Sequence, residues 1–100
     1  MNMNMQQLLA QSQRMQKEIL NKKSKIDAME FVGKSEWVEI KFKGNRDVVS
    51  VDILNDEAFA KENKEVLCDM IELAIKDGLK KINNETESAF GQFSNLGGLF

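Results

Sequence analysis

Histidine, proline and tyrosine are all absent from this chain of 100 residues, and cysteine occurs only once, at Cys68. Without histidine, the sequence lacks the side chain that most often transfers protons near neutral pH and most often binds metals. A lone cysteine can form neither an internal disulfide nor a thiolate zinc site, which is typical of a reducing compartment. The sequence therefore predicts no catalytic residues, no metal site and no cofactor, and it favours a cytoplasmic protein.

Long apolar runs are also missing, since no stretch approaches the ~18 residues that a membrane span needs. The N-terminal segment has no charge ahead of an apolar stretch and no small-residue cleavage pattern, so we expect no secretory signal and no membrane partner. Apolar residues make up 42% of the chain and charged residues 30%, a balance typical of globular domains. We expect a single domain over residues 1–100.

The small net charge of -2 hides a strong asymmetry along the chain. Residues 1–26 contain five Lys or Arg against one Glu, a net charge of +4, whereas residues 27–100 contain nine against fifteen acidic residues, a net charge of -6. Such a separation indicates that one part of the surface meets an anion.

Two segments have the composition and spacing of long helices. From Met3 to about Met29 there is no glycine, and apolar residues recur at steps of three and four. From about Lys64 to Phe90 the apolar face is broader than a surface helix needs, and it includes Cys68, which we expect in the core. Asn55 and Asn63 predict caps, the first for a short helical turn and the second for the long helix.

Between the helices the apolar period changes to two, which predicts three strands. A first strand over residues 31–34 is followed by a hairpin, in which the turn at residues 44–47 joins strands at residues 38–42 and 49–53. We expect Ile40 and Val51 to be buried on the face that a helix covers.

The element order predicts an α+β fold with a three-stranded antiparallel sheet flanked by two long helices, in the order helix, three strands, short helix, long helix. The first helix would be roughly 40 Å long, more than strands of ~5 residues can cover, so we expect part of it to project. Apolar stripes and open strand edges would remain uncovered in a monomer, which predicts a homodimer. From Gly91 to Phe100 the chain is rich in glycine and predicts a flexible tail.

Four blocks of the chain, in this order and spacing, resemble the YbaB/EbfC family of bacterial nucleoid-associated proteins. The blocks are MQQLLAQSQRMQKEI, GKSEWVEIKFKGNRDVVSVDI, ENKEVLCDMIELAIKDGLKKI and NLGGLF. The resemblance implies a homodimer whose sheets join at the centre and whose paired helices project like tweezers. It also implies duplex DNA as the partner, bound in the nucleoid with little sequence preference and with no small-molecule substrate.

Basic side chains on both helices are the candidate DNA contacts, because lysine and arginine neutralise phosphates. On the first helix they are Arg14, Lys17, Lys22, Lys23 and Lys25, and on the last they are Lys76, Lys80 and Lys81. Two other interpretations of these residues stay open. The lysines can form an ordinary solvated helix face, and the Met-rich helices can serve a non-enzymatic protein-interaction scaffold. Gly78, in the middle of the last helix, indicates either close packing at a dimer interface or a tolerated defect.

Overall fold

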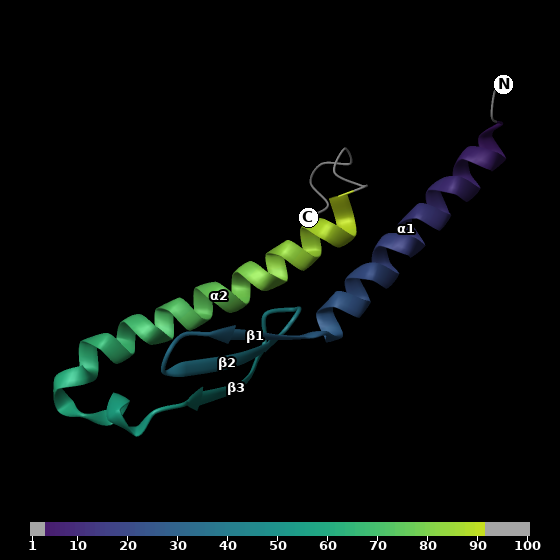
Figure 1. The fold of residues 1–100 in the computed structure, drawn as a ribbon. Helices are drawn as coiled ribbons and strands as arrows, with labels where there is room; N and C mark the ends of the chain where they lie inside the picture. The colour runs from purple at the N-terminus through teal and green to yellow at the C-terminus, as the bar shows by residue number, and fades with distance from the viewer. Residues whose placement is uncertain (1–3, 92–100) are drawn as a thin grey trace.

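The computed structural model describes residues 4–91 of the chain, and Figure 1 shows its elements in order. These are α1 (Met5–Ala28), β1 (Glu30–Lys34), β2 (Val38–Lys43), β3 (Val48–Ile53), the short 3-10 helices η1 (Asp56–Phe59) and η2 (Lys61–Asn63), and α2 (Lys64–Phe90). The predicted α+β fold and its element order are confirmed. The predicted Gly-rich tail lies, from residue 92 on, outside the described residues.

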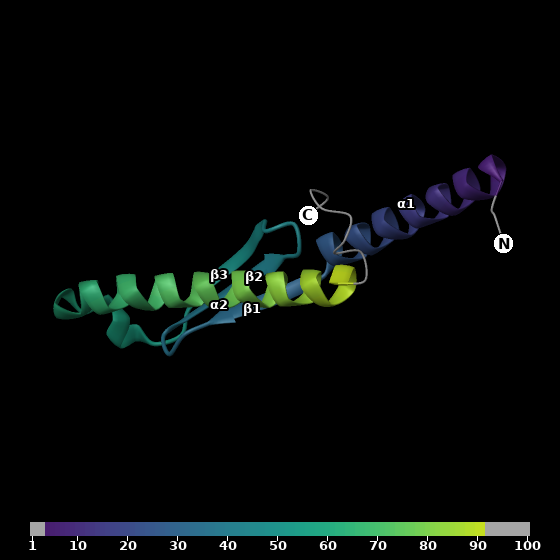
Figure 2. The ribbon, with the colours of Figure 1, turned by 90° about the horizontal axis from the view of Figure 1, so that it is seen from above.

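The three strands form one antiparallel sheet in the order β1-β2-β3, and α2 lies across one face of it (Figure 2). Alternate residues of β2 point toward α2, so Val38, Ile40 and Phe42 are buried while the residues between them stay partly exposed. Ala74 and Ile82 of α2 complete this core from the other side. The sheet and α2 together therefore form the body of the molecule.

Two glycines allow α2 to lie directly on β1. A Cβ atom on Gly33 would collide with the Ala74 carbonyl oxygen and the Gly78 backbone, and one on Gly78 would collide with the ring of Phe42. Close packing therefore explains Gly78, and it is not a tolerated defect. The packing partner is the sheet of the same chain and not a dimer interface.

We expect Gly33→Ala to lower the free energy of unfolding by about 2–3 kcal/mol, because the added methyl group meets backbone atoms that cannot rotate away. Urea denaturation measures the change. Gly91→Ala is the matched control, since a Cβ at Gly91 meets nothing within 4 Å. Equal destabilisation of the two variants would contradict this packing.

The expectation that Val51 is buried is wrong for the single chain. Val51 pairs with Ile40 and lies on the same face of the sheet, yet its side chain is 59% exposed, against 3% for Ile40. The reason is that α2 lies over β1 and β2, so the apolar face of the edge strand β3 is left uncovered (Figure 2). Val48 and Val49 are exposed in the same strand.

Within residues 4–91, α1 packs against the body from Met15 onward. Ile26 packs against Phe90 at the end of α2, and Met15, Ile19 and Ala89 surround this pair. The first turns of α1 continue past the end of α2, beginning at a capping box formed by Asn4 and Gln7 (Figure 1). The radius of gyration of 19.9 Å far exceeds the ~13 Å of a compact domain of this length, so the prediction of a projecting helix is confirmed.

Two local expectations from the sequence are wrong. Cys68 is exposed, because the broad apolar face of α2 meets the sheet along only part of its width. Asn63 precedes α2 but does not cap it through its side chain, which instead donates a hydrogen bond of 2.9 Å to the Glu57 carbonyl oxygen in η1. Asn55 does cap η1, because its side chain accepts from the Glu57 backbone N–H.

Candidate nucleic-acid interface

Three of the predicted cations share one exposed face of α1. Arg14, Lys17 and Lys25 are spaced so that they return to the same side of the helix, and Asn21 lies between them. Together with Glu18 and Lys22 they line a shallow hollow of about 460 Å³. We call Arg14, Lys17 and Lys25 the α1 basic face.

The cations of the α1 basic face are not held in ion pairs, even though the Glu18 carboxylate lines the same hollow. Among residues 4–91, none of its three cations forms an ion pair with a carboxylate, whereas six other lysines do. Their side chains are exposed, so they can approach an anion without first breaking an internal ion pair. This face is therefore the strongest candidate for neutralising phosphates.

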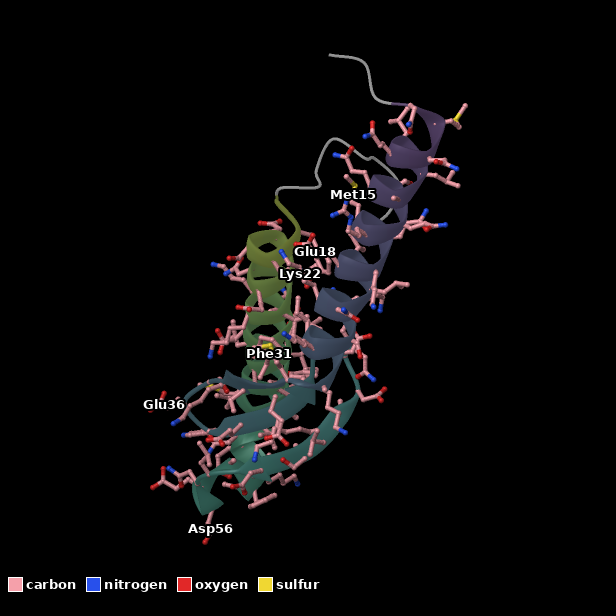
Figure 3. All side chains as sticks on the ribbon, turned by 90° about the vertical axis from the view of Figure 1, so that its right-hand side faces the viewer. Met15, Glu18, Lys22, Phe31, Glu36 and Asp56 are labelled. Carbon is pink, nitrogen blue, oxygen red and sulfur yellow. The ribbon has the colours of Figure 1, made fainter. Side chains whose placement is uncertain are left out.

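Lys22 lies on the side of α1 that faces the end of α2, together with Met15 and Glu18 (Figure 3). Its ammonium Nζ is 3.8 Å from a Glu18 carboxylate oxygen and donates a hydrogen bond of 3.3 Å to the Ala89 carbonyl oxygen. Lys22 therefore joins the two helices, and binding to DNA would compete with that role.

Lys23 lies about 100° around the helix from Lys22. Its ammonium group is 2.9 Å from an Asp27 carboxylate oxygen, and it lines a separate pocket beside the turn between β2 and β3. The structure therefore does not bring Lys22, Lys23 and Lys25 together in one patch, because three residues so close in a helix point in different directions.

The three lysines of α2 differ in their surroundings. Lys76 forms an ion pair of 3.0 Å with Glu72, while Lys80 is exposed and has no ion pair within residues 4–91. Lys81 pairs with Asp77 at 3.0 Å and donates a 2.7 Å hydrogen bond to the Val32 carbonyl oxygen of β1.

The Asp77 carboxylate has a second partner, the backbone N–H of Lys34, which donates to it at 2.9 Å. This hydrogen bond, followed by the one from Lys81, lowers the pKa of Asp77 below its ordinary value. Lys81 and Asp77 thus fasten α2 to the first strand. Of the α2 lysines, Lys80 keeps the charge most available to a partner.

Arg46 was not among the candidate DNA contacts predicted from the sequence, because residues 44–47 were assigned only to a turn. It reaches α2, where its guanidinium Nη2 donates a 2.7 Å hydrogen bond to the Asn83 side-chain oxygen. One signal was present in the sequence, namely an arginine in a tight hairpin turn where glycine or asparagine is favoured.

A metal site and a membrane-spanning helix are both absent from the described part of the chain. Residues 4–91 hold no group of three His, Cys, Asp or Glu side chains placed to bind a metal ion. Within the same residues no helix is long and apolar enough to cross a membrane.

The whole chain is similar to known proteins in sequence and in fold. Nucleoid-associated protein SUB1611 of Streptococcus uberis is 36% identical over 94 residues, covering 92% of this chain and 94% of the relative. A nucleoid-associated protein of Streptococcus pneumoniae has the same identity and coverage. The crystal structure of the uncharacterized protein HP0035 from Helicobacter pylori matches with a TM-score of 0.73 and 26% identity, covering 92% of this chain and 99% of that one. The model of the YbaB/EbfC DNA-binding family matches residues 1–99, and the chain therefore belongs to that family.

Proposed function

We propose that this protein is a nucleoid-associated homodimer that binds duplex DNA mainly through phosphates, with low sequence preference, using the α1 basic face. The observation that carries the proposal is the set of three exposed cations on a projecting helix, none of them paired with a carboxylate within residues 4–91. The family and its relatives support DNA as the ligand.

The acidic remainder of the chain does not oppose this binding strongly. Screening at physiological salt limits the reach of each exposed charge to ~8 Å, and the molecule is 71 Å long. Acidic residues near the start of α2, at the far end of the body, therefore have little effect on a phosphate at the α1 basic face. The local charge of the helix, rather than the net charge of -2, governs the encounter.

A second copy of the chain would cover the apolar face of β3. Val48, Val49 and Val51 are exposed there, and Leu54 and Phe59 extend the apolar surface beyond the end of the strand. As an edge strand, β3 also presents backbone groups that another strand can pair with. Dimerisation through β3 would bury this surface and give the assembly two α1 basic faces, which doubles the number of phosphates it can neutralise.

The protein-interaction scaffold remains the alternative, and one observation favours it. Met5, Leu8 and Leu9 are exposed on the projecting turns of α1, where they could dock on an apolar groove. Catalysis is not proposed, since the family is a DNA-binding one and the chain has no histidine.

Electrophoretic-shift titration of two unrelated duplexes, repeated at several salt concentrations, tests the proposal. We expect similar affinities for the two sequences, because phosphate contacts position a protein without reading bases. We also expect the logarithm of the association constant K to fall linearly with the logarithm of the salt concentration. The slope should be about -0.9 for each phosphate neutralised. Binding that is absent at low salt, or that does not weaken as salt rises, would contradict phosphate neutralisation and favour the scaffold.

A further inference from the structure

A pocket of about 290 Å³ lies where α1, the β2–β3 turn and α2 meet. Ile26 and Phe90, both buried, belong to its wall, and Thr86 of α2 lines it as well. The charged groups around it are Lys23, Asp27 and Arg46. Lys23 and Asp27 form an ion pair, so their charges offset each other. Arg46 therefore gives the pocket a net positive charge. We call it the junction pocket.

The turn holds Arg46 in a strained backbone conformation. Arg46 has φ of 75°, and within residues 4–91 it is the only residue other than glycine with a positive φ. Its N–H donates to the Lys43 carbonyl oxygen at 2.8 Å, and Asn45 braces the turn through two hydrogen bonds to Asp47. Glycine at position 46 would form the same turn without strain. The turn itself therefore does not require an arginine at this position.

The turn is fixed against α1, so the pocket has a defined shape. The Gly44 N–H donates a 2.9 Å hydrogen bond to the Met29 carbonyl oxygen. A Cβ atom on Gly44 would collide with the Ile26 carbonyl oxygen, which shows that the two backbones touch directly. Arg46, in the turn, and Lys23, on α1, therefore line one pocket with no flexible segment between turn and helix.

The Arg46 guanidinium has donors to spare. It carries five N–H groups, and within residues 4–91 it makes a single hydrogen bond, to neutral Asn83, and no ion pair. That bond orients the planar group on α2. A planar guanidinium with parallel donors can bind two oxygens of a phosphate or carboxylate group at once, and DNA supplies phosphates.

We propose that the junction pocket binds a phosphate group, with Arg46 as its principal ligand, while Lys23 offsets the charge of the Asp27 carboxylate in the same pocket. The pocket size is at the small end of ligand sites, enough for one phosphate and part of the sugar attached to it. That phosphate can belong to a duplex or to a free phosphate ester. If it belongs to a duplex, the inference rests on the proposed function and adds a second phosphate site to it.

The junction pocket is separate from the α1 basic face. The two share no lining residue, and Lys23 points to the side of α1 opposite Lys25 and Arg14. A duplex held by the α1 basic face therefore need not fill the junction pocket, and the two sites can be tested independently.

Backbone amide NMR of the ¹⁵N-labelled full chain tests the inference with two probes, inorganic phosphate and a short DNA duplex. Sodium chloride at matched ionic strength is the control for general salt effects. We expect phosphate to shift the amides of Gly44, Arg46 and Thr86 in a saturable way. Arg46→Gly should weaken this binding about ten-fold or more, and Arg46→Lys should weaken it less.

The melting temperature of Arg46→Gly shows whether this variant is still folded. Arg46→Gly relieves the strained backbone but removes the bond to Asn83, so its melting temperature should stay within a few degrees of the parent. If the duplex shifts the same three amides and Arg46→Gly weakens duplex binding, the phosphate is one of DNA. If inorganic phosphate shifts these amides in a saturable way and the duplex does not shift them, the ligand is a free phosphate ester.

Absence of saturable shifts with both probes, or equal shifts in Arg46→Gly, would overturn the inference. Shifts at Asn21 and Lys25 report duplex binding at the α1 basic face in the same spectra. A failure of the junction pocket is therefore distinguishable from a failure of the proposed function.

Discussion

Val51→Asp is expected to convert the protein from a dimer into a monomer that is still folded. The substitution places a carboxylate in the apolar surface of β3 that we propose a second copy covers. An unpaired charge buried at an interface costs several kcal/mol, so the dimer dissociation constant should rise at least about 100-fold. Because Val51 is exposed in the single chain, the fold itself should tolerate the change. Light scattering should report a mass near 11.4 kDa, against twice that mass for the parent.

Ser50→Asp is the matched control for this experiment. Ser50 is the neighbour of Val51 in β3 and is also exposed, but it pairs with Lys41 and so lies on the opposite face of the sheet. It should remain a dimer. A parent chain that is monomeric at micromolar concentration, or a Val51→Asp variant that stays dimeric, would rule out assembly through this face.

Replacing all three residues of the α1 basic face by glutamine should lower duplex affinity by about ten-fold or more at low salt. Glutamine keeps the helix propensity of arginine and lysine, so folding should survive. A dimer loses six charges, and the slope of log K against log salt should fall by up to ~0.9 for each phosphate that the variant no longer neutralises. The reduction in affinity should be similar for unrelated sequences. Fluorescence anisotropy of a labelled duplex at several salt concentrations measures both quantities.

Matched variants separate the effect of where a charge lies from the effect of the net charge of the protein. Lys61 and Lys64 are exposed near the start of α2, at the far end of the body from the projecting turns of α1, and have no ion pair within residues 4–91 (Figure 1). Lys61→Gln/Lys64→Gln removes the same charge as Lys17→Gln/Lys25→Gln, so only the second pair should weaken binding. Equal weakening by both pairs would mean that DNA responds to overall charge and not to the α1 basic face.

Much of the fold could be predicted because each element has a strong local signal. The long segment without glycine predicted α1, and the change of period from helical to two-residue spacing predicted the hairpin around Ile40. Both signals depend on residues close in sequence. The lateral position of α2 on the sheet has no such signal, which is why the sequence could not show that Val51 lies beyond the edge of the helix.

The candidate site was predictable by residue type but not by grouping. A run such as Lys22, Lys23 and Lys25 is compact in sequence, yet successive helical residues point about 100° apart. Only the packing of α2 decides that Lys22 turns inward to Ala89 while Lys25 stays exposed. Arg46 was missed for a related reason, since its approach to Asn83 joins residues 37 positions apart.

Site-specific photocross-linking from α1 tests the central claim most directly. A photoreactive residue at Asn21, in the middle of the α1 basic face, is compared with one at Glu62, which is exposed at the other end of the body. We predict cross-links to a bound duplex from position 21 and none from position 62. Cross-links from position 62 alone, or none from either position when the duplex is in excess, would contradict binding by the α1 basic face.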